Sequence, residues 1–366
     1  MNNADNQLTS TPDLASPPSL ISRNKKVTTT LTLLIILSLS AIISGLLLGT
    51  TTLSPFYLLR LFSENNLNHD TLIIQARLPR VLIGLLAGMS LAMAGCVMQA
   101  LTRNPLADPG LLGVNAGANA SIITLSLLSF SANWPLFWLA IPGALLTSAM
   151  VYLLSRGHNQ SPTRLILSGA AISAVLGAYV QARVIVNPSL FSDLKYWMSG
   201  SLSGLQLSDI NTIWPYFIIA TVILLLLAPA LNLLSIDRNI AISLGANLRW
   251  QPQLGWLGAT ILCAASTATV GSLTFVGLAS AHLSRFIAPQ DFRWQLPISA
   301  LIGGNLVVIA DVIARTLMPP TELITGIVVA MLGAPFLYLA VRRDQMKKSS
   351  SVTPCKRRLK RNSNEN

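Results

Sequence analysis

The sequence contains few of the side chains from which active sites are built. Charged residues make up only 10% of its 366 residues, and there are just three histidines and three cysteines. No lysine follows a glycine anywhere, which excludes the nucleotide-binding motif G-x-x-x-x-G-K-S/T. His69, His158 and His282 are too scattered to give the i, i+4 pair of a helical metal site. We therefore predict that the chain is not an enzyme and holds no metal and no cofactor.

Long apolar runs dominate the chain instead. Hydrophobic residues account for 52% of it, and a helix needs about 20 of them to cross a hydrocarbon core roughly 30 Å thick. The pattern predicts an all-α polytopic membrane protein with about ten transmembrane helices. The predicted spans cover residues 27–49, 81–101, 110–130, 134–154, 164–186, 212–234, 254–273, 274–288, 296–317 and 323–341.

Three of these spans carry interruptions. Arg183 falls late in the fifth span, and Gly271, Gly277 and His282 interrupt the seventh and eighth. Broken or short helices are tolerated at membrane depth only where they are buried in protein or face a water-filled cavity. We expect one of these two environments for the interrupted spans.

The two ends of the chain differ from the middle. Residues 1–26 are rich in Asn, Ser, Thr and Pro, which predicts a disordered cytoplasmic tail. Residues 27–341 form one transmembrane domain. Residues 342–366 form a basic cytoplasmic tail, which we interpret as a topology determinant resting on anionic lipid, with a specific partner site as the less favoured alternative.

The net charge of +12 follows membrane sidedness and does not indicate a nucleic-acid partner. With ten crossings and both termini in the cytoplasm, the inner segments hold most of the Lys and Arg residues. This distribution supports a multi-pass chain with that orientation. The membrane that we expect is the cell inner (plasma) membrane. The bases left on the outer side are Arg60, Arg77, Arg80, Arg183, Lys195 and Arg315.

Arg77, Arg80 and Arg315 are the main positive features of the outer side. They either anchor the chain to lipid headgroups or form a docking site for acidic side chains of a soluble partner. Asp311 lies four residues before Arg315, so the two share a helix face and can pair. Glu322 precedes the last span, where its carboxylate would cap the positive end of the helix dipole.

A short amphipathic helix is predicted on the cytoplasmic side, between the sixth and seventh spans. Ser235 or Asp237 can cap its start, and Gly245 suits the position after its end. Its apolar stripe needs a cover, which is either the lipid headgroup region or another protein. The stripe consists of Ile236, Ile240, Ala241 and Leu244.

Small residues crowd the spans 81–101 and 164–186. Close approach between helices is the simpler explanation, and a passage for a bulky solute would leave the same pattern.

Short motifs are spread from about residue 30 to residue 341. They are Arg77-Leu78-Pro79-Arg80, Gln99, Arg103-Asn104-Pro105-Leu106-Ala107-Asp108-Pro109 with Leu112-Gly113, Tyr196-Trp197-Met198-Ser199-Gly200-Ser201-Leu202, Leu244-Gly245, Phe275-Val276-Gly277-Leu278, Pro297-Ile298-Ser299-Ala300-Leu301, Ala310-Asp311 and Gly333-Ala334-Pro335. Together they resemble the permease subunits of binding-protein-dependent ABC importers for iron-siderophores, haem and cobalamin. The resemblance implies a ten-helix protomer that pairs with a second permease protomer, two copies of an ATP-binding subunit, and a periplasmic solute-binding protein.

The resemblance also implies roles for individual residues. The docking arginines fall on Arg77, Arg80 and Arg315. The segment that couples to the ATPase falls on residues 236–248, and within it we single out Asp237, Ala241, Leu244 and Gly245. The cytoplasmic gate falls on Asn104 and Leu106, with a second gate segment at Pro162 and Thr163.

The leading hypothesis is a permease that moves a ferric siderophore from periplasm to cytoplasm, energised by a separate ATPase. A cobalamin or haem permease is the alternative within the same class. A proton-coupled secondary carrier, with its proton site on Asp311, Glu322 or Asp108, and a non-transporting membrane scaffold are the alternatives from other classes.

Overall fold

The computed structural model describes residues 20–56, 69–128, 134–155, 162–188, 195–235, 250–288, 291–335 and 338. Within these ranges the regular structure is entirely helical, which confirms the predicted all-α class. The helices are α1 (Leu20–Leu47), α3 (His69–Thr102), the 3-10 helix η1 (Pro109–Leu112), α4 (Val114–Leu127), α5 (Leu136–Ser155), α6 (Pro162–Val186), α8 (Leu207–Leu226), α9 (Ala228–Ser235), α11 (Gln251–Val270), α12 (Val276–Ile287), α13 (Phe292–Thr316) and a last helix, Thr325–Pro335.

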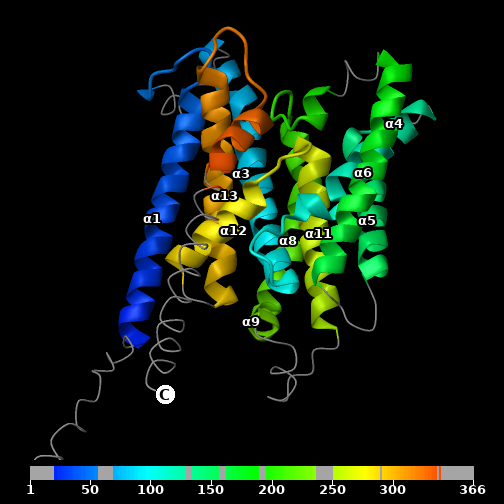
Figure 1. Ribbon diagram of the computed structural model, residues 1–366. Helices are drawn as coiled ribbons and strands as arrows, with labels where there is room; N and C mark the ends of the chain where they lie inside the picture. The colour runs from blue at the N-terminus through cyan, green and yellow to red at the C-terminus, as the bar shows by residue number, and fades with distance from the viewer. Residues whose placement is uncertain are drawn as a thin grey trace, which may run out of the picture.

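The long helices stand side by side in one bundle (Figure 1). Helix α1 lies at one end of the bundle and α4, α5 and α6 lie at the other. Helix α3 runs through the interior and packs against α13, α11 and α12. It is the most buried of the helices long enough to cross a membrane, whereas α6 is the least buried.

Each of the ten predicted spans contains a helix, but not all of these helices are long. Seven are long and apolar enough to cross a membrane: α1, α3, α5, α6, α8, α11 and α13. Helix α4 has 14 residues and α12 has 12, and both begin inside the bundle. The short helices therefore depend on their neighbours to cover their ends.

Two predicted boundaries were wrong, and proline is the reason in both cases. Helix α3 begins at His69, well before the predicted start at residue 81, because it continues through Pro79. Arg77 and Arg80 consequently lie on one face of a helix instead of ahead of it. The predicted span 212–234 is two helices, α8 and α9, because Pro229 lacks an N–H and is favoured in the first turn of a new helix.

The small residues of α3 serve close helix packing. A Cβ atom placed on Gly88 would collide with the carbonyl oxygen of Gly303 in α13. A Cβ atom placed on Gly95 would collide with the carbonyl oxygen of Gly277 in α12. The backbones of α3, α12 and α13 therefore touch directly, as small residues at a membrane helix interface allow.

The interruption predicted between residues 254 and 288 is a break between two helices. Helix α11 ends at Gly271 with φ +79°, and Phe275 precedes α12 with φ +66°. A positive φ is uncommon for a side chain as large as phenylalanine. Gly277 and His282 lie inside α12 and do not interrupt it.

Candidate functional site

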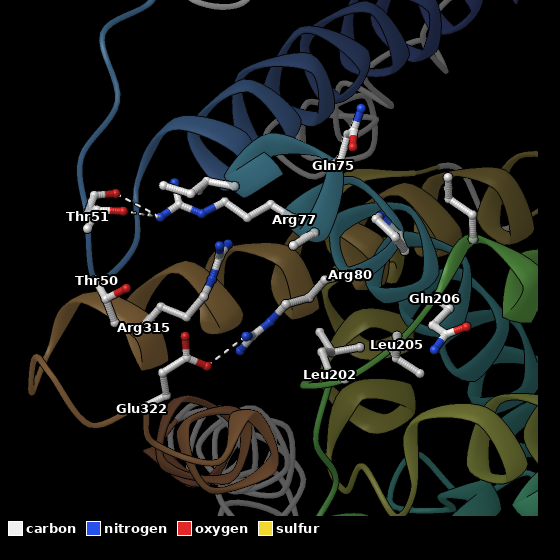
Figure 2. Close-up of a pocket in the computed structure, with 15 residues that line it drawn as sticks. Thr50, Thr51, Gln75, Arg77, Arg80, Leu202, Leu205, Gln206, Arg315 and Glu322 are labelled. Atoms are coloured by element: carbon white, nitrogen blue, oxygen red, sulfur yellow. Dashed lines mark hydrogen bonds and ion pairs between the residues drawn. The ribbon is translucent and has the colours of Figure 1, made fainter. Parts of the chain in front are cut away.

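The predicted docking arginines lie together at one end of the bundle. Arg77 and Arg80 come from α3 and Arg315 from the end of α13, and they line a cavity of about 710 Å³ (Figure 2). Glu322, from the loop after α13, lies at the same cavity. We call these four residues together with Asp311 the outer arginine cluster.

Arg80 binds two carboxylates that come from different elements. Its Nη2 lies 2.8 Å from Oδ1 of Asp311, and its Nε donates to both oxygens of Asp311 at 3.0 and 3.1 Å. Its Nη1 lies 2.7 Å from Oε2 of Glu322. The guanidinium group thus joins α3, α13 and the loop before the last helix, using the fork geometry that suits carboxylates.

Arg315 completes the cluster from α13. Its Nε lies 3.0 Å from Oδ2 of Asp311, which confirms the pairing predicted from their spacing. Its Nη2 donates to the carbonyl oxygen of Gly45 at 2.9 Å. Nη1 of Arg315 is buried and has no hydrogen-bond partner among the described residues.

Arg77 caps the end of α1. Its Nη1 donates to the carbonyl oxygens of Leu46 and Leu47 at 3.0 and 3.2 Å, and its Nη2 donates to that of Thr51 at 2.7 Å. The last carbonyl groups of a helix lack partners within the helix and carry partial negative charge. The buried guanidinium group of Arg77 supplies these carbonyl groups with hydrogen-bond donors and with a positive charge.

The cluster is more deeply buried than the sequence suggested. Arg77, Arg80 and Arg315 are only 7%, 9% and 2% exposed, so their charges do not lie open on the surface. Three arginines against two carboxylates leave the cluster a net charge of +1. Loss of one partner from such a buried ion pair strongly destabilises a protein, because the other charge is left buried and unpaired.

Glu322 does not cap the last helix, contrary to our expectation. Its carboxylate contacts Arg80 and accepts a hydrogen bond of 3.3 Å from Ser203 Oγ, whereas the last helix begins at Thr325. Burial opposes ionisation, but the hydrogen bond and charge of Arg80 outweigh it and hold the pKa of Glu322 below its usual range. Glu322 is therefore a carboxylate at neutral pH.

The predicted gate residues Asn104 and Leu106 form a turn at the other end of α3. The Leu106 N–H donates to Asn104 Oδ1 at 2.9 Å, and the Leu106 side chain is 44% exposed. Arg103, which begins this turn with φ +48°, donates from Nε to the carbonyl oxygen of Leu234 in α9 at 3.2 Å. This end of α3 is thereby attached to α9.

After this turn the chain runs back into the interior of the helix bundle. Asp108 is buried and lies against Gly277 of α12, which itself contacts Gly95 of α3. Gly95 is two turns before the end of α3, so the chain rises by roughly 10 Å before α4 begins. Thr267 of α11 fixes this start by donating to Asn115 Oδ1 at 2.8 Å.

A second cavity, of about 520 Å³, lies between the start of α4, helix α6 and the break after α11. The small residues of α6 that line it are Ala170, Ser173 and Gly177, and a Cβ atom on Gly177 would meet open space. The passage interpretation therefore fits α6, whereas close packing fits α3. Polar lining comes from Asp108, Asn115, Asn119, Ser173, Gln181, Ser272 and Thr274.

Asp108 is the titratable group among the described residues that line this second cavity. Its Oδ2 accepts a hydrogen bond of 3.1 Å from the Gly110 N–H and caps η1. Burial raises the pKa of Asp108 to about 6. From the sequence, Asp108 is part of the Arg103–Pro109 motif and a candidate proton site, and Asp-Pro-Gly is in addition a typical helix start that indicates this turn.

The remaining predicted site residues are only partly visible. Pro162 begins α6 and Thr163 follows it, but their side chains lie outside the described residues. The coupling segment, with Asp237, Ala241, Leu244 and Gly245, also lies outside them, as does the chain from 339 onward. In the described part of the chain, no group of three or more His, Cys, Asp or Glu residues could hold a metal ion.

Comparison with known proteins places this arrangement among transport proteins. The chain is 40% identical over 314 residues to the ferric enterobactin transport system permease protein FepD of Escherichia coli (strain K12), which covers 85% of this chain and 94% of FepD. It is 36% identical over 282 residues to the hemin transport system permease protein HmuU of Yersinia pestis, covering 75% of this chain and 84% of HmuU.

A solved structure agrees with these relatives. A metal-chelate type ABC transporter in an inward-facing conformation matches with a TM-score of 0.74 at 28% identity, covering 86% of this chain and 99% of the matched chain. The FecCD transport family matches residues 33–343, which include both cavities and every described helix that borders them. The chain therefore belongs to the FecCD transport family.

Proposed function

We propose that the chain is the permease subunit of an ABC importer that moves a ferric siderophore inward across the cell membrane. The observation that carries this proposal is the 40% identity to a ferric enterobactin permease along 85% of the chain. The working assembly contains a second permease protomer, two ATP-binding subunits and a periplasmic solute-binding protein. Both termini lie in the cytoplasm, so the outer arginine cluster faces the periplasm.

The cavity beside α6 supports a transport path for a bulky polar solute. Its lining combines small, apolar and neutral polar side chains with one carboxyl group, that of Asp108, and none of the described lining residues is basic. An anionic iron chelate therefore meets hydrogen-bonding groups but no cation that would hold it. Only 11% of the most apolar stretch of α6 is buried against the rest of the chain. The helix therefore offers a long open face to a second protomer.

At the periplasmic end, Arg77, Arg80 and Arg315 receive acidic side chains of the binding protein. The three side chains are buried, so the docking carboxylates approach through the mouth of the 710 Å³ cavity. The net positive charge of the cluster favours that approach.

At the cytoplasmic end, Asn104 and Leu106 close the path, with Pro162 and Thr163 as a second closing segment. Residues 236–248 transmit ATP-driven motion from the ATPase. The bond between Arg103 and Leu234 supports this arrangement, because it links the gate turn to α9, which leads directly into that segment.

Reconstitution in proteoliposomes tests the proposal. We expect uptake of ferric siderophore only when the ATPase, ATP and the loaded binding protein are all present. Uptake that persists without the ATPase would instead support a proton-coupled carrier. A panel of haem, cobalamin and ferric siderophores, each with its own binding protein, decides the solute class.

The coupling role has a separate test with a matched control. Leu244→Asp places a charge in the apolar stripe, and we expect ATP hydrolysis to become uncoupled from transport. Ile242→Asp makes the same kind of replacement on the opposite side of the predicted helix and should leave transport intact. Equal transport in both variants would indicate that lipid, and not the ATPase, covers the stripe.

A further inference from the structure

The two carboxylates on Arg80 are held very differently. Asp311 is 2% exposed in its side chain, and besides its ion pairs it accepts a hydrogen bond of 2.9 Å from Thr325 Oγ1. Glu322 is 32% exposed in its side chain and contacts only one guanidinium nitrogen, Nη1 of Arg80. The exposed contact is the one that a competitor in the cavity can reach.

Glu322 has little else to hold it in place. Its second hydrogen bond, from Ser203 Oγ, is long at 3.3 Å. Figure 2 shows the carboxylate reaching from the loop toward Arg80 across the cavity, next to Arg315. An incoming carboxylate at this position would find the same guanidinium nitrogen, Nη1 of Arg80.

Displacement of Glu322 would also act on the second cavity. Ser203 belongs to a loop in which the Gly200 carbonyl accepts from the Gly326 N–H at 2.8 Å and Ser201 N–H donates to Val270 at 3.0 Å. Val270 is the last residue of α11, directly before the break that lines the path. Glu322 thus contacts, through Ser203, a loop that is itself hydrogen-bonded to the residue directly before the break.

We propose that Glu322 is an internal stand-in for a carboxylate of the docking binding protein. The incoming carboxylate replaces Glu322 at Nη1 of Arg80. The hydrogen bond between Ser203 Oγ and the displaced Glu322 then breaks. Docking in this way loosens the loop that carries Ser203 when the partner is present. The inference rests on the proposed function, because it needs a binding protein that docks at the outer arginine cluster.

The test measures the affinity of the complete permease–ATPase complex in nanodiscs for its loaded binding protein. Glu322→Gln removes the competing charge, and we expect docking to become about fivefold tighter, since a charge-assisted contact is about twice as strong as a neutral one. Ser203→Ala should tighten docking in the same direction by a smaller factor. Asp209→Asn is the matched control. It removes one negative charge from α8, whose first residue lines the same cavity, and Asp209 accepts a hydrogen bond from the Gln206 N–H instead of pairing with the arginines.

A folded Glu322→Gln complex that docks with unchanged or weaker affinity would overturn the inference. So would an equal gain in Asp209→Asn, because the effect would then be general electrostatic attraction. If Glu322→Gln does not assemble, the absence of any gain in Ser203→Ala decides against it. A wild-type complex that shows no docking at all overturns the proposed function itself.

Discussion

Arg315 near the end of α13 donates a hydrogen bond of 2.9 Å to the carbonyl oxygen of Gly45, in the last turn of α1. Arg77 donates to the next two carbonyls, those of Leu46 and Leu47. Two arginines that we predicted for partner docking thus also terminate a helix of their own chain. Substitutions at these positions will change stability as well as docking, and experiments have to separate the two effects.

Arg315→Met should destabilise the protein by about 3 kcal/mol, because the Gly45 carbonyl oxygen and Oδ2 of Asp311 both lose their contact with the Arg315 guanidinium group. Thermal unfolding of the purified protein measures this change. Arg164→Met is the control, since Arg164 is exposed at the start of α6. Equal melting temperatures for the two variants would contradict the capping role.

Arg77→Lys separates charge from geometry. Lysine keeps the positive charge but lacks the fork that reaches Leu46, Leu47 and Thr51 together. We expect a lower melting temperature with docking of the binding protein largely retained. Arg77→Glu would face those carbonyl oxygens with a carboxylate and lose both. If Arg77→Lys kept full stability, the three backbone contacts would contribute little.

Gly95→Ala should be poorly tolerated, because its methyl group would collide with the backbone of Gly277. We expect a loss of about 2 kcal/mol or more from overpacking, measured as lower thermal stability. Gly177→Ala is the matched control in α6, where the methyl group meets open space and alanine favours the helix by about 1 kcal/mol. A Gly95→Ala protein as stable as wild type would show that α3 and α12 can separate without loss.

Asp108→Asn should stabilise the protein at neutral pH. Burial raises the pKa of the carboxyl from 3.8 to about 6, so the folded state binds the proton more tightly than the unfolded state does. The resulting penalty of about 3 kcal/mol is complete above pH 6 and disappears below about pH 4. Wild type should therefore gain stability on acidification, and the variant should not.

The same variant distinguishes the two transport classes. Asp311 and Glu322 are paired with arginines, so Asp108 is the remaining candidate for a proton site. Uptake by Asp108→Asn in the reconstituted importer should continue, because ATP supplies the energy. Abolished uptake in a folded, ATPase-bound protein would revive the carrier hypothesis.

The sequence was sufficient to predict the class of fold, because apolar runs indicate membrane-spanning helices and the distribution of Lys and Arg indicates which loops lie on which side. It was also sufficient for the pair of Asp311 and Arg315, whose spacing within one helix determines their contact. Contacts between distant segments were not predictable in this way. Arg80 and Glu322 are separated by 242 residues, and their contact depends on how α3 and α13 pack.

Prolines and glycines caused the remaining errors and ambiguities. The sequence predicts that a span begins just after Pro79, although α3 continues through this proline. The small residues of α3 and α6 look alike in sequence, yet one set packs against other backbones and the other lines a cavity. Only the positions of neighbouring helices distinguish the two uses.

The direct backbone contact of Gly88 with Gly303 and of Gly95 with Gly277 has a mechanical consequence. No flexible side chain lies between these backbones, so little of a displacement can be absorbed there. Helices α3, α12 and α13 therefore move as one rigid unit. A movement of α9, transmitted through its hydrogen bond with Arg103, would displace Arg77 and Arg80 at the other end of α3 relative to α1.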